Sequence, residues 1–249
     1  MARHASAPEP QVIKRSRRAF LAFGGAAIAS VLGWEWIWSR PMEDGLPGPF
    51  RRVLDSNGSL ASRLLFDDQH LDPQLSADRV ESLRPNGEIG LDDDLDDSDW
   101  KVAVRPDDFA PSFQITVEDI RAIPKTEHIT EFKCIEGWST ITRWGGARFR
   151  DFVSSYSPRS NHAKFVGLVT PNQDYFVGID MASIMHPQTL LCYEMNGQPL
   201  REEHGAPLRL VIPVKYGIKS IKRIATISFT QNRPPDYWAN NGYDYYAGL

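Results

Sequence analysis

The pattern of hydrophobic and polar positions divides the chain into stretches of different character. Residues 19–38 are almost continuously apolar, which is typical of a segment that meets a membrane. Residues 50–66 place apolar side chains at helical spacing and predict a helix, whereas residues 67–99 are polar and irregular. From Trp100 onward the chain consists of short apolar runs separated by turn residues. The folded part of the protein is therefore predicted to lie mainly after residue 99.

The short runs of the C-terminal part read mostly as strands. Predicted strands cover residues 100–104, 129–135, 164–170, 175–179, 190–195, 208–214 and 224–230. A short helix is predicted to begin near Thr116 and a second one to cover 146–156, and Asn196-Gly197 predicts a tight turn. Short strands interleaved with short helices favour a single mixed α+β domain over a doubly wound parallel sheet.

The first forty residues have the composition of a targeting segment. Residues 16–21 read Ser-Arg-Arg-Ala-Phe-Leu and precede the apolar run, which is the pattern of a twin-arginine export signal. That route carries folded proteins and therefore suits enzymes that take up a cofactor before export. The 20 residues from Ala19 to Trp38 could also span a bilayer, and three tryptophans near their end suit its interface. Residues 1–40 are thus predicted to be either an export signal or an N-terminal membrane anchor.

Length and charge limit the remaining organisation. A chain of 249 residues accommodates one sizeable domain, which we place at 100–249, after a linker, helix and acidic loop at 41–99. The formal net charge of −4 gives no reason to expect a nucleic-acid partner. Residues 88–99 contain seven acidic side chains, which predict either a solvated loop or a docking surface for a basic partner.

Two cysteines, Cys134 and Cys192, leave several interpretations open. They could form one disulfide, or one could be a functional thiol and the other a core residue. Cys192 lies in an apolar run and is interpreted as core. Cys134 follows a predicted strand, with Lys133 beside it and Gly137 breaking the chain soon after. Because a nearby cation lowers a thiol pKa and a thiolate binds soft metals, Cys134 is a candidate metal ligand; a core residue and a catalytic nucleophile are the alternatives.

A second group of chemically suggestive residues is basic. Residues 203–223 combine glycines, which let a backbone approach a ligand closely, with positive side chains. This combination predicts a phosphate or pyrophosphate site without a P-loop, the alternative being a solvated basic face. The candidate cations are His204, Arg209, Lys215, Lys219 and Lys222.

Four ordered segments together resemble a known family. They read K-C-I-E-G-W-S (133–139), H-P-Q-T-L-L (186–191), H-G-A-P-L-R (204–209) and K-Y-G-I-K-S-I-K (215–222). They are similar to the sulfite oxidase superfamily of molybdopterin-binding oxidoreductases, and within it to the catalytic subunits of bacterial periplasmic protein-methionine-sulfoxide reductases and their small relatives. The resemblance runs from about residue 100 to about residue 246.

The resemblance implies a set of site residues. Cys134 would ligate molybdenum, and Thr170, His204 and Arg209 would contact the molybdopterin. In the methionine-sulfoxide reductase subunits an Asn stands where this chain has His204. The pterin phosphate would be held by Ser220, Ile221 and Lys222. The family also uses an Asn near the start of the domain, a role for which Asn57 is the candidate, although the aromatic pair that follows it in the family is missing here.

The implied activity is two-electron oxygen-atom transfer at a molybdenum-molybdopterin cofactor. Reduction of an S- or N-oxide, small or protein-bound, is the favoured direction. Sulfite-type anion oxidation is the alternative, with Arg143 and Arg148 as candidate anion-binding groups, and Arg143 and Trp144 are candidates for the pocket mouth. A non-catalytic binding module that keeps the fold and a cysteine hydrolase built on Cys134 are the competing classes.

The partners follow from what the chain lacks. It contains no cysteine cluster for an iron–sulfur centre and no haem attachment motif, so a separate redox partner such as a membrane b-type cytochrome is expected. The twin-arginine export machinery would be a second partner. A periplasmic or extracytoplasmic location follows, with inner-membrane anchoring if the N-terminal segment is retained.

Overall fold

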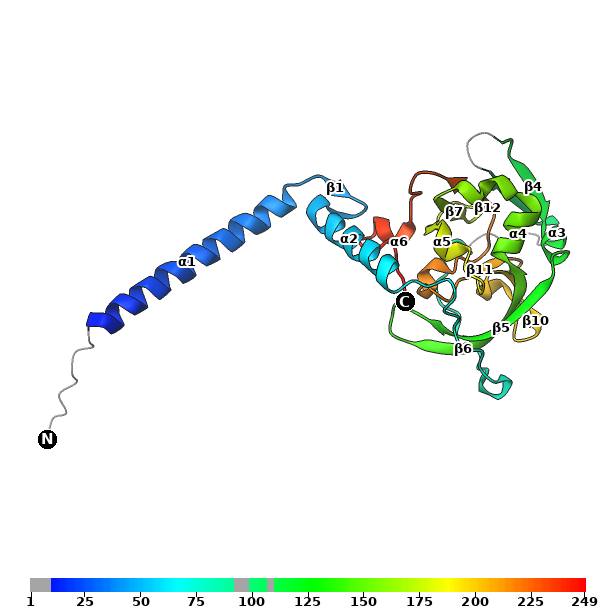
Figure 1. Ribbon diagram of the computed structural model, residues 1–249, viewed down its shortest axis with the longest axis horizontal. Helices are drawn as coiled ribbons and strands as arrows, with labels where there is room; N and C mark the ends of the chain where they lie inside the picture. Colours follow the sequence, from blue (N-terminus) through cyan, green and yellow to red (C-terminus); the bar gives the residue numbers. More distant parts are fainter. Residues whose placement is uncertain (1–9, 92–98, 107–109) are drawn as a thin grey trace.

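The computed structural model describes residues 10–91, 99–106 and 110–249, and it shows a long helix projecting from a rounded domain (Figure 1). Helix α1 runs from Pro10 to Trp38, and its residues 16–38 are mostly exposed and are long and apolar enough to cross a membrane. The predicted apolar segment is therefore a single helix. Most of the acidic run at 88–99 lies outside the described residues, and its predicted role stays untested.

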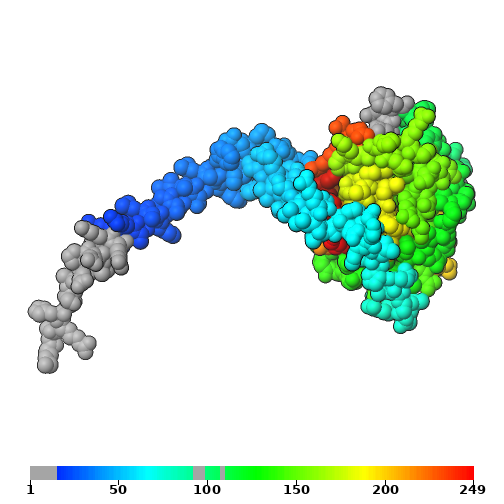
Figure 2. All heavy atoms as spheres, in the orientation of Figure 1, coloured from blue at the N-terminus to red at the C-terminus, as the bar shows by residue number. Residues whose placement is uncertain are grey.

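A second helix connects α1 to the domain. Strands β1 (Met42–Glu43) and β2 (Leu46–Pro47) form a small hairpin that leads into α2 (Gly48–Leu64). This confirms the helix predicted at 50–66. Figure 2 shows α2 lying between the narrow projection of α1 and the rounded body of the molecule.

Two five-stranded sheets make the domain. The first has the order β10-β9-β6-β5, with β11 also pairing with β9, and the second has the order β4-β3-β12-β7-β8, in which β12 and β3 are parallel. The strands of the first sheet are β5 (Lys125–Lys133), β6 (Ser139–Arg148), β9 (Leu190–Met195), β10 (Gln198–Pro199) and β11 (Arg209–Val211). Those of the second are β3 (Lys101–Arg105), β4 (Phe113–Thr116), β7 (Phe165–Val169), β8 (Phe176–Asp180) and β12 (Thr226–Thr230).

The main hydrophobic core receives side chains from both sheets. Apolar residues of β3, β7 and β12 meet residues of β6, β9 and β11, together with Phe149 and Phe152 of helix α4 (Phe149–Tyr156). Helices α3 (Val117–Arg121), α5 (Met181–Ile184) and α6 (Tyr237–Asn240) are short. The mixed α+β class expected from the sequence is therefore the observed one.

One element differs from the sequence prediction. The helix expected at 146–156 begins only at Phe149, because residues 139–148 form β6 and pair with both β5 and β9. The register of β6 against β9 shifts between Gly145 and Gly146. A Cβ added at Gly146 would lie 2.2 Å from the Leu191 carbonyl oxygen, so this close strand approach needs a glycine. Pairing with β9 outweighed the local helical pattern.

Candidate functional site

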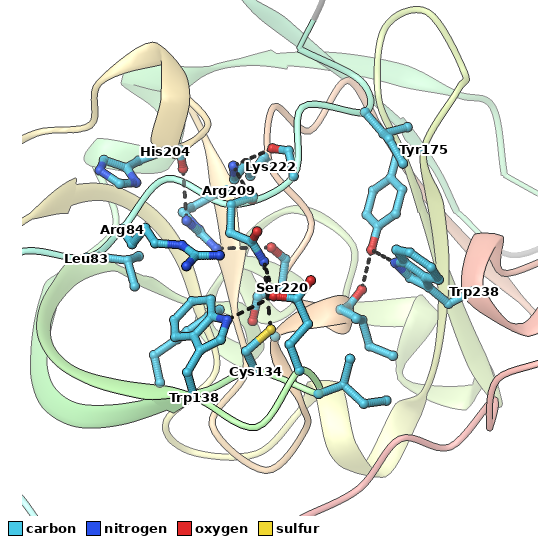
Figure 3. Close-up of a pocket in the computed structure, with 18 of the residues that line it drawn as sticks. Leu83, Arg84, Cys134, Trp138, Tyr175, His204, Arg209, Ser220, Lys222 and Trp238 are labelled. Carbon is cyan, nitrogen blue, oxygen red and sulfur yellow. Dashed lines mark hydrogen bonds between the residues drawn. The ribbon is translucent and has the colours of Figure 1, made fainter.

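A pocket opens beside the first sheet and brings together segments distant in sequence (Figure 3). One side is formed by Cys134 and Trp138, and the facing wall by Tyr175 and Trp238. Cationic groups lie between the two sides, from the 203–223 region. The lining also includes Leu83, Arg84, Asn86, Gly87, Ile89, Phe132, Ile135, Glu136, His204, Arg209, Gly217, Ile218, Ser220, Lys222 and Tyr243.

Cys134 is positioned by the tight loop that joins β5 to β6. Its backbone N–H donates to the Trp138 carbonyl at 2.9 Å, and the Gly137 N–H donates to the Cys134 carbonyl at 3.1 Å. Gly137 has φ +86°, a left-handed conformation that suits glycine, and it closes this loop. The Cys134 side chain thereby reaches the pocket at the end of a rigid hairpin, as the predicted strand end implied.

The environment of Cys134 differs from the predicted one. Burial raises the pKa of the Cys134 thiol, and the charge of Arg84 partly opposes this rise. The pKa of this thiol is therefore raised overall, whereas the neighbouring Lys133 led us to expect a lowered one. Both cysteines are unpaired, which excludes the disulfide, and Cys192 is fully buried, as expected of a core residue.

An asparagine that the sequence did not single out lies next to the cysteine sulfur. The Asn86 Nδ2 donates to Cys134 Sγ at 3.8 Å and to Glu136 Oε2 at 3.3 Å. The Trp138 Nε1 donates to the same Glu136 oxygen at 3.0 Å, so the exposed carboxylate of Glu136 is held beside the sulfur. Asn57, the predicted asparagine, is exposed on α2 and does not line the pocket. Asn57 therefore lies away from the pocket, and the asparagine next to Cys134 is Asn86.

Arg209 is a buried cation with no acidic partner. It is 2% exposed, and its guanidinium donates to the carbonyls of His204 at 3.0 Å and Ser220 at 3.2 Å. It also lies over the Trp144 ring, 4.9 Å from the centroid. Burial lowers its pKa to about 10, so it stays protonated at neutral pH. Within the described chain no ion pair links Arg209 to a carboxylate. A buried charge without a counter-charge is costly unless a ligand supplies one.

His204 is neutral, in contrast to the predicted positive charge. Burial lowers its pKa to about 4, with further lowering by Arg209 and Arg201. Its Nε2 lies 3.2 Å from Arg201 Nη2, a donor, so Nε2 accepts and Nδ1 carries the proton. This Nδ1 is buried and has no hydrogen-bond partner in the described structure. His204 therefore has an unused donor at the pocket.

Lys222 joins two segments of the pocket wall. Its Nζ donates to the carbonyls of Asn86 and Gly87 at 2.8 Å each and of Glu203 at 2.7 Å. These bonds use all three ammonium hydrogens, so direct binding of a phosphate would require exchanging one of them. Gly205 packs against the Lys222 stem, where an added Cβ would lie 2.6 Å from Lys222 Cβ. The side chain thus shapes the pocket and also adds positive charge to it.

The remaining predicted residues fall into two groups. Ser220 lines the pocket, and its Oγ accepts from the Ile212 N–H at 3.4 Å, which leaves its proton to donate. The others do not line this pocket, and the cofactor contacts expected of Thr170 and Ile221 stay predictions. Thr170 is buried in a loop and bonds Asn172 and Tyr175, and Ile221 belongs to the main core. Trp144 is buried beneath Arg209, whereas Arg143 and Arg148 lie elsewhere on β6. Lys215 forms an ion pair with Asp180, and Lys219 forms one with Asp236.

The arrangement fits an anionic cofactor that offers hydrogen-bond acceptors. It supplies an uncompensated buried guanidinium at Arg209, an unpartnered donor at His204 Nδ1 and a hydroxyl at Ser220. Gly217 keeps the wall open, since a Cβ there would meet the Phe132 ring at 2.6 Å. The single sulfur of Cys134 lies at one end of this donor set (Figure 3). These are the features required by a phosphorylated pterin dithiolene whose metal is bound by one thiolate.

Comparison with known proteins gives a family match over most of the described domain. The family described as Oxidoreductase molybdopterin binding domain matches residues 89–238. Among solved structures, the sulfane dehydrogenase SoxCD from Paracoccus pantotrophus matches with a TM-score of 0.49 and 18% identity, over 56% of this chain and 40% of that one.

The chain is also similar to curated proteins named as methionine-sulfoxide reductase subunits. The protein-methionine-sulfoxide reductase catalytic subunit MsrP of Campylobacter jejuni is 29% identical over 259 residues, covering 96% of this chain and 82% of its own length. The MsrP catalytic subunit of Xanthomonas campestris pv. campestris is 34% identical over 57% of this chain. A protein from Azospira oryzae named putative protein-methionine-sulfoxide reductase subunit YedZ1 is 36% identical over 53% of this chain. For these last two the match spans 48% and 50% of their own length.

Proposed function

Because the chain belongs to the oxidoreductase molybdopterin-binding domain family, we propose that it binds a molybdenum-molybdopterin cofactor and reduces an S-oxide or N-oxide substrate. The family assignment makes it an oxidoreductase. The direction and the substrate class are the proposal, and the methionine-sulfoxide reductase relatives support the S-oxide.

The observation that carries the proposal is the single thiol next to a cationic pocket. Cys134 would be the protein ligand of the metal, while Arg209, Ser220 and His204 Nδ1 would hold the anionic and polar parts of the pterin. When bound, the cofactor supplies two-electron oxygen-atom transfer. A non-catalytic module or a cysteine hydrolase would give no reason for a buried cation that lacks a counter-charge.

The protein residues would manage protons and orientation. Reduction of a sulfoxide consumes two electrons and two protons and releases the sulfide and one water. Glu136 is held beside Cys134 by the Asn86 amide and the Trp138 indole, so we assign to its carboxyl group the delivery of protons to the departing oxygen. The aromatic wall of Tyr175 and Trp238 would receive the apolar part of the substrate; the Trp238 Nε1 fixes the Tyr175 hydroxyl at 3.0 Å.

Oxidation of a sulfite-type anion is the second candidate. It would require a further cation near the metal, and Arg84 at the pocket rim is the one observation in its favour, since it lies 5.7 Å from the Trp138 ring centroid. Arg84 is exposed, however, and an exposed cation binds a substrate anion only weakly because water screens its charge. The reductase direction is therefore preferred.

We also propose a location and a partner. The exposed helix at 16–38 would export the chain by the twin-arginine route and hold it at the inner membrane from the periplasmic side. Electrons would come from a separate membrane subunit such as a b-type cytochrome. The same proposal includes a three-part organisation of the chain. It consists of a targeting or anchoring segment at 1–40, a connecting segment at 41–99 and the oxidoreductase domain at 100–249.

The decisive experiment is metal analysis of protein purified from a host that makes molybdopterin. About one molybdenum per chain is expected, since the cofactor and not the protein carries the redox chemistry. The protein should also reduce methionine sulfoxide with a reduced viologen as electron donor. In Cys134→Ala, metal and activity should be lost while circular dichroism stays unchanged. Well-folded wild-type protein without molybdenum would overturn the proposal.

Asn86 and Asn57 form a matched pair in the same assays. Asn86→Ala removes the amide beside Cys134 and Glu136 and should lower metal retention or activity about 10- to 100-fold, the usual range for an outer-shell group. Asn57→Ala, on exposed α2, should change neither. Equal effects of the two substitutions would contradict the assignment of Asn86.

A further inference from the structure

Helix α2 carries an exposed apolar stripe that no other described part of the chain covers. Val53, Leu60 and Leu64 are 56%, 58% and 72% exposed. They are spaced by seven and four residues, which places them on one face of a helix. These three side chains extend over three turns of the helix, with the exposed Asn57 between them on the same face. An apolar stripe of this kind on a surface helix indicates a contact with something outside the chain.

The opposite face of α2 is fixed to the domain. Arg51, 2% exposed, donates to the carbonyls of Ala239 at 2.6 Å and Tyr243 at 2.9 Å. Gly58 allows close contact with the C-terminal segment, because a Cβ there would lie 2.9 Å from Tyr246 Cβ. The apolar stripe therefore points away from the domain and cannot turn inward without breaking these contacts.

The charges beside the stripe are positive. Arg52 and Arg63 are exposed and eleven residues apart, so they lie on the same flank of the helix. The acidic residue of α2, Asp55, is on the domain side, where Arg233 Nη1 donates to it at 2.8 Å. Arg52 has one exposed carboxylate neighbour, Glu43, at 3.5 Å. An apolar face flanked by arginines is the composition of a helix that lies on an anionic lipid surface.

The neighbouring helix places α2 where such a surface would be. Residues 16–38 of α1 can cross a membrane, and the exposed Trp34, Trp36 and Trp38 near its end suit the interface. The Trp34 and Phe50 rings lie 6.4 Å apart, so the end of α1 contacts the first turn of α2. The chain turns between the two helices, and α2 runs at an angle to α1 (Figure 1). A bilayer around α1 would therefore have its boundary at the start of α2.

From these observations we infer that α2 is an interfacial helix that lies on the surface of a bilayer containing anionic lipid, with Val53, Leu60 and Leu64 inserted and Arg52 and Arg63 at the headgroups. The inference rests on the proposed membrane anchoring, not on the proposed chemistry. It has a consequence for the pocket. Arg51 ties α2 to the segment that carries Trp238 and Tyr243, so the pocket wall is attached to the membrane-bound helix.

Spin labels on the full-length, cofactor-loaded protein in lipid nanodiscs test the inference. The variants are Leu60→Cys and Leu64→Cys, with Ser155→Cys, exposed on α4, as the matched control; the native cysteines are both buried. With phosphatidylglycerol present, collisions with oxygen should exceed those with a water-soluble nickel reagent several-fold at positions 60 and 64. The order should be reversed at position 155. In nanodiscs of phosphatidylcholine alone, the excess of oxygen collisions over nickel collisions at positions 60 and 64 should become smaller.

Two outcomes would overturn the inference, and two further measurements test the other proposals separately. Labels at 60 and 64 that are as accessible to nickel as the label at 155 would overturn the interfacial position. Protection of these labels only after a membrane partner is added would also overturn it, in favour of a protein contact. Co-elution of the protein with nanodiscs reports separately on anchoring by α1, and viologen-linked sulfoxide reduction reports separately on the proposed function.

Discussion

Arg209 shows how a single residue defines the ligand of this pocket. Among the described residues, this guanidinium is 2% exposed, bonds backbone carbonyls, lies over aromatic rings and has no carboxylate in an ion pair. Replacing it by a neutral residue would remove a cost from the cofactor-free protein and remove affinity from the loaded one. The buried charge of this residue therefore favours an anionic ligand in the pocket.

The lowered pKa of His204 leads to a prediction about how the stability of the protein depends on pH. Its folded-state pKa of about 4 lies below the ordinary 6.5, so between these values the unfolded chain binds more protons. The cofactor-free protein should therefore become less stable as the pH is lowered. Between pH 7 and pH 5, protonation linked to this residue should lower the free energy of unfolding by about 2 kcal/mol. His204→Gln should lose this part of the pH dependence.

Urea unfolding of both proteins at the two pH values measures the difference. His128 and His186, whose pKa values are also lowered by burial, are present in both proteins and therefore cancel. An unchanged pH slope in His204→Gln would show that His204 is not a buried neutral group.

At the scale of elements, the pocket wall depends on loops that are joined by side chains. The segment that carries Asn86 and Gly87 has no strand of its own and is held by the Lys222 ammonium, which also bonds the carbonyl of Glu203. The β5–β6 hairpin, in contrast, positions Cys134 through backbone pairing alone. One side of the site is therefore held by strand pairing, whereas the other is held largely by side chains, among them Lys222, Leu83 and Arg223.

Lys222→Met should loosen that second side. The change keeps the stem packed against Gly205 but removes three hydrogen bonds, so amide exchange in residues 83–91 should accelerate while exchange in β5 and β6 stays unchanged. Lys222→Arg, which keeps the charge, is the control and should show a smaller effect. Hydrogen-exchange mass spectrometry measures both. Unaltered exchange in 83–91 would contradict the role given to Lys222.

At the scale of the whole molecule, buried ion pairs fasten the C-terminal segment to the domain. Lys219 and Asp236 are each 1% exposed and in contact, and Lys219 also donates to the Gly178 carbonyl at 3.1 Å. Asp236 in turn accepts from the Ala239 N–H at 2.9 Å at the start of α6. The pair thus joins β8, the 217–219 turn and the helix that carries Trp238, so it holds one wall of the pocket in place.

Lys219→Met should leave the Asp236 charge buried and unpaired and should lower the free energy of unfolding by about 3–5 kcal/mol. Adding Asp236→Asn, which keeps a side-chain acceptor for the Ala239 N–H, should recover a large part of the loss. Urea unfolding of the single and double variants tests this. A double variant no more stable than Lys219→Met would show that the buried charge is not the cause.

The sequence by itself determined what depends on near neighbours along the chain. The Thr116 capping box with Asp119, the Asn196-Gly197 turn with both φ values positive, and the periodic helix α2 all arise from contacts within a few residues, and all three were predictable. The segment that carries Cys134 was recognisable for the same reason, because its chemistry is contained in seven consecutive residues.

Only the tertiary structure decided which side chains meet. Asn86 lies 48 residues from Cys134 and Lys222 lies 136 residues from Asn86, distances over which no local pattern carries information. Lys215 and Lys219 read as a continuation of the basic cluster, yet each is paired with a distant aspartate. Asn57 and Asn86 are chemically identical in the sequence. Packing of the 83–91 segment against the sheet placed one of them at the thiol, and the helix left the other in solvent.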